Sequence, residues 1–400
     1  MTSRKSLFVK VLIVLFFTFL TLYLTDFIRG EYSSLFTLQE ASLSSTIALG
    51  GLFTISSMLC MYLRNTTTKR IDVHVCFIAF LSIITIISFI HAPFVSVGSR
   101  NVYIGLLTYF TCFYAFLRLS KYAEFIVFLK CALFIVFIVL LYYYFSNYNQ
   151  LKVLSSRLLS LNSSYILLFL FPVVSYLSNR RIGILLAFLV VVVMLISNKR
   201  GGVIAGGMSI LAYYVVVYLF SGQINISKRL KQSVLFAIIL VGFYFVIRMI
   251  LSSDSTMVMD RFSSLQDDEG SGRLDIWKEV WASIKNSSFI SLFFGHGIDS
   301  VKQVTSDGNS AHNEYLEIMY DFGWVALLCF LWFIIRLFKM CNILIKERSE
   351  IAAPLLSLSI MLVSMSIISH TVIYPTIMII VSSSLGYFFG RIEYSNVKTR

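Results

Sequence analysis

The stretch IGILLAFLVVVVMLISNKRGGVIAGGMSILAYYVVVYLF, residues 182–220, decides the fold class of this chain. It holds two apolar runs that are separated only by the short polar turn SNKRGG at 197–202. Apolar runs of roughly this length are long enough to cross the hydrocarbon core of a bilayer as helices. The stretch therefore predicts two consecutive membrane-spanning helices, at 182–197 and 203–220.

The same pattern recurs along the whole chain. The other apolar runs lie near 7–24, 43–63, 73–90, 101–119, 123–146, 158–177, 233–251, 323–340, 352–370 and 376–390. The chain is 58% hydrophobic and 13% charged, with a mean hydropathy of +0.83, which excludes a soluble globular enzyme. We predict an all-α polytopic integral membrane protein with about twelve transmembrane helices, the first of them retained because no small-residue cleavage site follows it.

The basic residues predict the orientation of these helices. Lys and Arg outnumber Asp and Glu by 33 to 20, and they sit in short clusters between the apolar runs rather than on one basic surface, so no nucleic-acid partner is expected. With the N-terminus inside, the inside segments carry 19 Lys and Arg and the short outside loops carry six. This asymmetry follows the positive-inside rule and predicts that both termini are cytoplasmic.

A long polar insert divides the chain into three parts. Residues 252–322 hold 12 of the 20 acidic residues and only five Lys and Arg, so their net charge is −7. We expect this segment to be a large extracytoplasmic loop that carries the outward-facing function. Residues 1–251 then form helices one to nine with short loops, and residues 323–400 form helices ten to twelve with a cytoplasmic tail.

The turn between the seventh and eighth runs carries two cations on the outer side, where topology does not require them. Lys199 and Arg200 precede Gly201 and Gly202, which open the next helix with free backbone N–H groups and a positive dipole end. Arg geometry favours phosphate among anions. The alternative is a Lys–Arg pair that snorkels to lipid headgroups, and the same ambiguity applies to Arg248 in the ninth run.

The loop segment from 272 to 286 has helical spacing of apolar residues. These residues are Leu274, Trp277, Trp281 and Ile284. The resulting amphipathic helix is expected to lie on the membrane or to cap the spans. Arg273 falls in its first turn, where the helix dipole repels a cation, so an anion held beside Arg273 is one explanation and neutralisation by the acidic run 267–269 is the other.

A second polar segment, NSAHNEYLEIMYDFGW, leads toward the tenth run at 309–324. It predicts a helix whose first turn contains His312, Asn313 and Glu314. A histidine accepts a proton near neutral pH, which makes His312 a candidate base, and Asn313 is placed to orient the ring. His296, in a glycine-bracketed turn, fits a structural role better.

Metal chemistry has weaker support. Asp26 with Glu31, or the run 267–269, has carboxylates that suit a divalent cation, but neither has a ligand spacing that demands one, and a solvated acidic loop explains the run. No protease, nucleotide-binding or lipase motif is present in the sequence. We predict no metal and no cofactor.

Taken in order, four motifs resemble a known superfamily. They are RGG at 200–202, SGRLDIW at 271–277, GHG at 295–297 and HNEYLEIMYDFGW at 312–324. This arrangement resembles the O-antigen ligase and Wzy O-antigen polymerase superfamily of bacterial surface polysaccharide assembly. The resemblance is strongest from about 182 to 340 and adds only a compatible topology in the first six runs.

The resemblance implies a fold and a reaction. The superfamily is similar to C-type glycosyltransferases (GT-C) that use an undecaprenyl-diphosphate-linked glycan as donor and need no metal. Carried over to this chain, its catalytic residues are Arg200, Arg273 and His312. The expected substrate contacts are Lys199, Gly201, Asn313, Arg248 and Glu314. The expected location is the bacterial inner membrane, with the active site facing the periplasm.

Four readings of the function stay open. An O-antigen polymerase, the preferred one, transfers the growing glycan to the non-reducing end of a lipid-linked repeat unit and is expected to work with a chain-length regulator. An O-antigen ligase transfers the glycan to lipid A–core. A transporter of lipid-linked oligosaccharide and a metal-dependent lipid-sugar transferase are the two remaining readings.

Overall fold

In the computed structural model, residues 3–34, 43–63, 72–91, 100–154, 162–197, 199–219, 273–306 and 308–398 are described. All regular elements within these ranges are helical. The helices are α1 (Ser3–Ser34), α2 (Leu43–Tyr62), α3 (Asp72–His91), α4 (Arg100–Leu119), α5 (Ile126–Leu154), α6 (Ser164–Leu177), α7 (Arg180–Ile196), α8 (Arg200–Leu219), α11 (Arg273–Asn286), α12 (Phe289–Phe294), α13 (Val301–Val304), α14 (Glu314–Lys346), α15 (Ala352–Ile368) and α16 (Pro375–Lys398). The short 3-10 helix η3 (Ala123–Phe125) precedes α5.

The predicted class, an all-α polytopic membrane protein, is confirmed. Eight described helices, α1 to α5, α8, α14 and α16, are long and apolar enough to cross a membrane. The helices α6, α7 and α15 are apolar but have fewer than 18 residues. They coincide with predicted spans, whereas the predicted ninth span, 233–251, lies outside the described residues.

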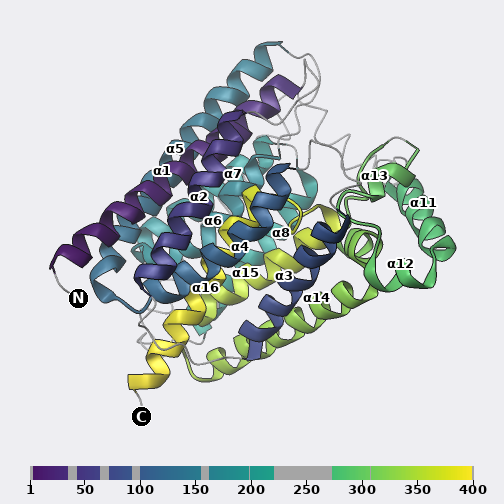
Figure 1. Cartoon of the computed structure of the whole chain (residues 1–400). Helices are drawn as coiled ribbons and strands as arrows, with labels where there is room; N and C mark the ends of the chain where they lie inside the picture. The colour runs from purple at the N-terminus through teal and green to yellow at the C-terminus, as the bar shows by residue number, and fades with distance from the viewer. Residues whose placement is uncertain are drawn as a thin grey trace.

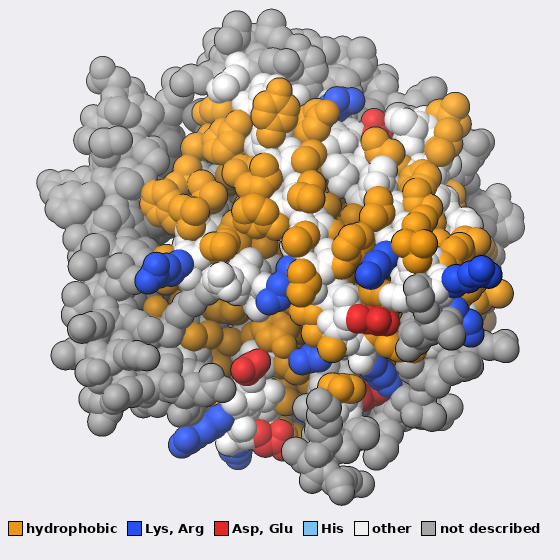
Figure 2. Space-filling view, turned by 90° about the vertical axis from the view of Figure 1, so that its left-hand side faces the viewer, with side chains coloured by type: hydrophobic (Ala, Val, Ile, Leu, Met, Phe, Trp, Pro, Cys, Tyr) orange, Lys and Arg blue, Asp and Glu red, His pale blue; other side chains and the backbone are white. Residues whose placement is uncertain are grey.

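The helices form one bundle with its polar elements at the ends. In Figure 1 the start of α1 and the end of α16 lie on one side of the molecule, and α11, α12 and α13 gather on the opposite side. Figure 2 shows a broad band of hydrophobic side chains on one face, with most of the Lys, Arg, Asp and Glu side chains below it. Such a band suits contact with lipid acyl chains.

Close packing of α4 against α16 depends on two glycines. Gly386 and Gly390 are four residues apart in the sequence GYFFG, so they share one face of α16. A Cβ atom at Gly386 would lie 2.2 Å from the carbonyl oxygen of Phe113, and one at Gly390 would lie 2.2 Å from that of Leu117. Small residues at this spacing let membrane helices approach until their backbones touch.

Replacing Gly386 by Val is expected to destabilise the bundle. The added side chain would collide with backbone atoms that cannot rotate away, and overpacking of this kind costs about 1–3 kcal/mol. The measurement is the unfolding temperature of the detergent-solubilised protein. Gly207→Val on α8 is the control, because a Cβ at Gly207 has no neighbour within 4 Å among the described residues. Equal unfolding temperatures for the two variants would contradict the prediction.

Ion pairs join four helices at the end that carries the termini. The Lys121 ammonium lies 2.6 Å from a carboxylate oxygen of Glu393, which joins the end of α4 to α16. Arg336 of α14 pairs with Asp72 at the start of α3. The orientation predicted from the sequence puts these basic residues inside the cell, and the orientation itself stays a prediction.

The helix α14 begins at Glu314, so the helix predicted at 309–324 and the apolar run predicted at 323–340 form one helix. It contains a kink at Gly323, which has φ 78°. A Cβ at Gly323 would lie 2.3 Å from the carbonyl oxygen of Phe293, so only glycine fits where the end of α12 packs against α14. The Asp321 carboxylate accepts hydrogen bonds from the backbone N–H groups of Asp299 and Val301, which follow α12 in the chain.

Candidate functional site

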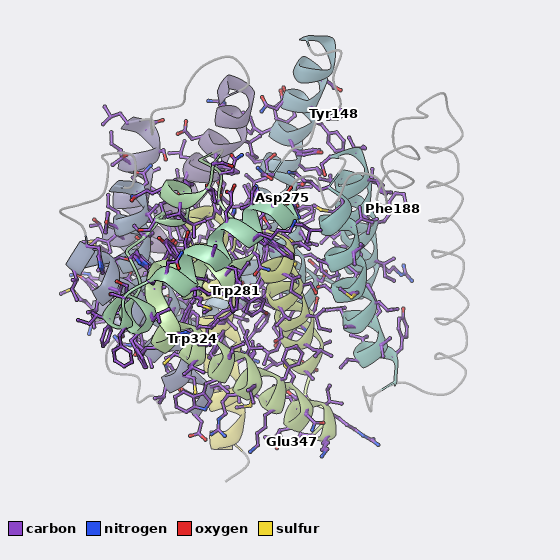
Figure 3. The ribbon with its side chains drawn as sticks, turned by 90° about the vertical axis from the view of Figure 1, so that its right-hand side faces the viewer. Tyr148, Phe188, Asp275, Trp281, Trp324 and Glu347 are labelled. Atoms are coloured by element: carbon purple, nitrogen blue, oxygen red, sulfur yellow. The ribbon has the colours of Figure 1, made fainter. Side chains whose placement is uncertain are left out.

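The predicted amphipathic loop helix is present as α11, and part of its predicted apolar stripe, Trp277 and Ile284, packs against the bundle. Val280 and Ile284 are buried, and the Trp277 indole N–H donates to the carbonyl oxygen of Ala311 at 2.7 Å. Leu274 and Trp281, predicted on the apolar stripe, are 46% and 43% exposed. In Figure 3, Asp275 and Trp281 mark α11 where it runs across the bundle, and Trp324 marks α14. The helix α11 therefore fixes the segment just before His312.

Arg273 is the first residue of α11, as predicted. Its guanidinium Nη1 donates to the carbonyl oxygen of Ile368, the last residue of α15, at 3.2 Å. That carbonyl belongs to a helix C-terminus, which carries negative partial charge. The acidic run 267–269, which offered the alternative partner, lies outside the described residues. The contact holds the Arg273 guanidinium group at the C-terminal end of α15.

The Lys199–Gly201 turn reaches the same helix end. Arg200 is the first residue of α8, and its side chain lies outside the described part of the structure. A Cβ at Gly201 would lie 2.4 Å from Cδ1 of Ile368, so this glycine lets α8 pack against α15. The Lys199 Nζ lies 5.8 Å from the ring centre of Tyr165. The turn and Arg273 thus meet at Ile368, although 72 residues separate them along the chain.

His312 lies two residues before α14 rather than in its first turn. Its φ is 51°, a left-handed conformation that few residues other than glycine adopt. Asn313 is the N-cap of α14, with Oδ1 accepting from the backbone N–H groups of Tyr315 and Leu316 at 3.1 and 3.3 Å. The predicted orienting residue therefore holds the helix start, and the cap fixes where the His312 backbone enters α14.

The surroundings of His312 keep its imidazole neutral. Burial, followed by the positive charges of neighbouring groups, lowers the pKa of His312 from 6.5 to about 4. The contributing neighbours are His370, Arg273, Lys199 and Lys302. A neutral ring with an accessible nitrogen can accept a proton throughout the physiological pH range.

Glu314, a predicted substrate contact, is fully buried and binds the loop between α15 and α16. Its Oε2 accepts hydrogen bonds from the backbone N–H of Thr371, from the Thr371 hydroxyl at 3.0 Å and from the N–H of Val372 at 3.2 Å. It does not line the pocket that contains His312. Its position therefore favours a supporting role: it fixes the loop of residues 369–374 beside the start of α14.

Two residues that the sequence prediction omitted, Glu317 and His370, complete the cluster. The ring centres of His370 and His312 are 4.8 Å apart, and His370 Nδ1 lies 2.5 Å from Oε2 of Glu317. The segment SHTVIYP at 369–375 contains a histidine and a proline between two apolar runs. That interruption is the signal that marks His370, but the predicted span 352–370 included it.

A pocket of about 370 Å³ opens beside the two histidines. Its lining residues are Phe27, Asn162, Tyr165, Ile166, His312, Ser369, His370, Tyr374, Thr376 and Ile377. These residues come from α1, α6, α16 and the two loops described above. The pocket therefore places titratable side chains next to aromatic and apolar ones, as ligand sites in proteins generally do.

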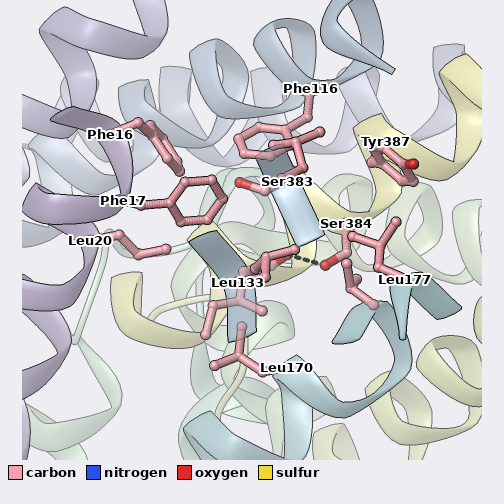
Figure 4. A pocket seen from close by; sticks show the side chains of 13 residues that line it. Phe16, Phe17, Leu20, Phe116, Leu133, Leu170, Leu177, Ser383, Ser384 and Tyr387 are labelled. Atoms are coloured by element: carbon pink, nitrogen blue, oxygen red, sulfur yellow. Dashed lines mark hydrogen bonds between the residues drawn. The ribbon is translucent and has the colours of Figure 1, made fainter. Parts of the chain in front are cut away.

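A larger pocket, of about 440 Å³, lies between α1, α4, α5, α6 and α16. Figure 4 shows the aromatic and aliphatic side chains that line it, with Ser383, Ser384 and Tyr387 among them. The Ser384 hydroxyl donates to Ile380 within its own helix. None of the lining residues is Asp, Glu, His, Lys or Arg, so the candidate chemistry belongs to the smaller pocket.

The remaining predicted residues cannot be compared with the site. Arg248 and the run 267–269 lie outside the described residues, and the side chain of Glu31 is not described. Asp26 lies in α1. Within the described ranges, no three His, Cys, Asp or Glu side chains are arranged to hold a metal ion.

These features define a helical, multi-pass membrane protein whose polar loops bring basic residues and two histidines together. Residues 165–331 match the family model described as O-antigen ligase. This match to part of the chain supports the predicted O-antigen ligase and polymerase superfamily. Members of this family are glycosyltransferase-like enzymes. No curated protein shows a match to the chain.

Proposed function

We propose that this protein is an O-antigen polymerase of the bacterial inner membrane. It transfers a growing glycan from undecaprenyl diphosphate to the non-reducing end of a lipid-linked repeat unit, without a metal and with inversion at the anomeric carbon. The observation that carries the proposal is that His312 lines a pocket and feels the positive charges of Arg273, Lys199 and Lys302, which come from three separate elements. An anionic donor suits such a site.

Each residue has a distinct role in the proposed transfer. The acceptor hydroxyl oxygen forms a bond to the anomeric carbon of the donor, and its proton passes to His312. The bond between that carbon and the diphosphate breaks, and the lipid diphosphate leaves with the electron pair. Arg273 and Arg200 stabilise the negative charge that develops on it, an effect most useful in the transition state.

Binding of the diphosphate is also expected to change the pKa of His312. Burial, and after it the neighbouring positive charges, lower the pKa of His312 in the free protein. A diphosphate between them offsets their charge, so the pKa of His312 rises in the complex and the imidazole becomes a stronger base when substrate is present. The site therefore couples donor binding to base strength.

The ligase reaction is the second candidate, because the family description names it. Both reactions use the same donor, and they differ only in the acceptor. The polymerase reading is preferred because the run at 312–324 and the compact form of the loop that contains it resemble polymerases more closely. The proposed location follows from the charge asymmetry: the termini are cytoplasmic and the pocket faces the periplasm.

The two reactions leave different products in a strain that lacks the protein. If it is a polymerase, we expect lipopolysaccharide core that carries a single repeat unit, because ligation continues while elongation stops. Electrophoresis of extracted lipopolysaccharide measures this directly. Bare core with long polymer retained on undecaprenyl diphosphate would identify a ligase, and an unchanged polymer ladder would reject both.

A further inference from the structure

The loop between α15 and α16 contributes a side chain that the proposed reaction has not yet used. His370 is 3% exposed, and it lines the same pocket as His312 although it lies beyond the end of the family match at 331. Its ring also faces Tyr374, with centres 5.4 Å apart. A buried histidine in a polar pocket needs partners for both of its ring nitrogens.

Only one of these nitrogens has a partner among the described residues. Nδ1 of His370 contacts Oε2 of Glu317, which is itself 1% exposed. Nε2 is buried and makes no hydrogen bond to any described residue. The ring is therefore fixed at Nδ1, while Nε2 has no hydrogen-bond partner among the described residues.

The charges around His370 favour its protonated form. Burial alone would lower its pKa, but the hydrogen bond to Glu317 and the negative charges of Glu317 and Glu314 outweigh burial, so the pKa of His370 is raised above 6.5. Lys302 of α13 acts in the opposite direction. The other titratable groups that face the two rings are Arg273 of α11, Lys199 before α8, and Tyr374.

The pKa values of the two histidines are thus shifted in opposite directions, although their ring centres are 4.8 Å apart. His312 is surrounded by cations and has a lowered pKa, whereas His370 is bound to a carboxylate and has a raised pKa. When two neighbouring titratable groups have pKa values that their environments push apart, the group with the lower pKa suits the role of base and the group with the higher pKa suits the role of acid.

We propose that His370, held by Glu317, is a second catalytic histidine whose Nε2–H donates a hydrogen bond to the diphosphate oxygen of the donor as that oxygen leaves the sugar. The assignment rests on the proposed function. The acceptor proton goes to His312 and later to water. His370 keeps its own proton and supplies a positive charge and a donor. The pocket then has one histidine for the acceptor oxygen, which forms a bond to the sugar, and one for the diphosphate oxygen, whose bond to the sugar breaks.

Two substitutions separate the two nitrogens of His370. His370→Asn places an amide near Nδ1, where it can still reach Glu317, but leaves nothing near Nε2. His370→Gln places a neutral N–H near Nε2. Removing a preorganised donor of this kind costs on the order of 10²-fold in kcat. We expect that loss for His370→Asn and a smaller loss for His370→Gln. The matched control is His74→Asn, a buried histidine near Glu393 at the opposite end of the bundle.

The pH dependence of kcat/KM provides a readout that a structural role would not change. Wild-type activity should rise as pH increases through about 4, where His312 becomes neutral, and fall as His370 loses its proton. Glu317→Gln removes the charge that supports the protonated ring, so the alkaline limb should move to lower pH. His370→Gln should abolish that limb. Because the positive charge of His370 no longer lowers the pKa of His312, this variant should also move the acid limb to higher pH.

The assay uses the full-length protein in liposomes, with the undecaprenyl-diphosphate-linked repeat unit extracted from cells that lack the protein. An unchanged rate for His370→Asn, or unchanged pH limbs for both Glu317→Gln and His370→Gln, would overturn the role of His370. A failure of the proposed function looks different. In that case the wild-type protein makes no polymer, or substitution of His312 leaves polymer formation intact.

Discussion

Replacing His312 by Asn is expected to abolish polymer formation while the protein stays folded in the membrane. The proposed base is lost, and a positioned general base contributes about 10²–10⁴-fold to a rate. Asn is the informative replacement because it tolerates a positive φ better than most residues, and the φ of His312 is 51°. A loss of activity in this variant therefore reports the missing imidazole rather than backbone strain. The measurement is the polysaccharide ladder of cells that carry the variant.

The chain offers a matched control for this substitution. Arg348 follows α14 and has φ 54°, so Arg348→Asn makes the same replacement in the same backbone conformation at the other end of the helix. We expect a normal ladder from that variant, with both proteins present at wild-type levels in the membrane fraction. A full ladder from His312→Asn would show that His312 is not the base.

Replacing Arg273 by Ala is expected to lower kcat/KM on the order of 10²–10³-fold, the usual effect of removing one group that stabilises developing charge. Arg273→Lys keeps a positive charge but loses the planar fork that binds two phosphate oxygens, so we expect only partial recovery. Lys278→Ala is the control, because Lys278 lies on the exposed side of α11 and pairs with Asp275. The liposome assay with extracted donor measures all three variants.

The same assay tests the role assigned to the two arginines. If guanidinium groups take the place of a divalent cation, the wild-type protein keeps its rate in excess chelator, and Arg200→Ala loses activity as Arg273→Ala does. Loss of wild-type activity in chelator would instead support a metal-dependent transferase. A normal rate for Arg273→Ala would remove Arg273 from the site.

The fold was largely predictable because long apolar runs dominate the chain. The partners of three acidic residues in the first turns of α14, Glu314, Glu317 and Asp321, were not. All three are buried. One oxygen of Glu314 accepts from the N–H groups of residues 371 and 372, one oxygen of Glu317 contacts His370, and both oxygens of Asp321 accept from the N–H groups of residues 299 and 301. These partners are distant in sequence, and a pattern along one helix cannot reveal them.

The site was predictable in part for the same physical reason. Arg273 stands out because a cation in the first turn of a helix opposes the helix dipole, and His312 because a histidine can accept a proton near neutral pH. The meeting of Arg273 with the turn at Gly201 depends on Ile368 of α15, which both contact. His370 carried no motif, because its role depends on Glu317 across the pocket, a contact 53 residues away in the chain.

The bonds from Glu314 and Glu317 to the loop at 369–374 set a limit on how this protein can be recombined with its relatives. The family match ends at 331, yet the Oε2 atoms of these two carboxylates, which lie within it, bond to atoms of residues 370–372. A hybrid that exchanges only the matched segment would bury two acids without their donors. Modular exchange to change glycan specificity therefore has to transfer both segments as one inherited unit.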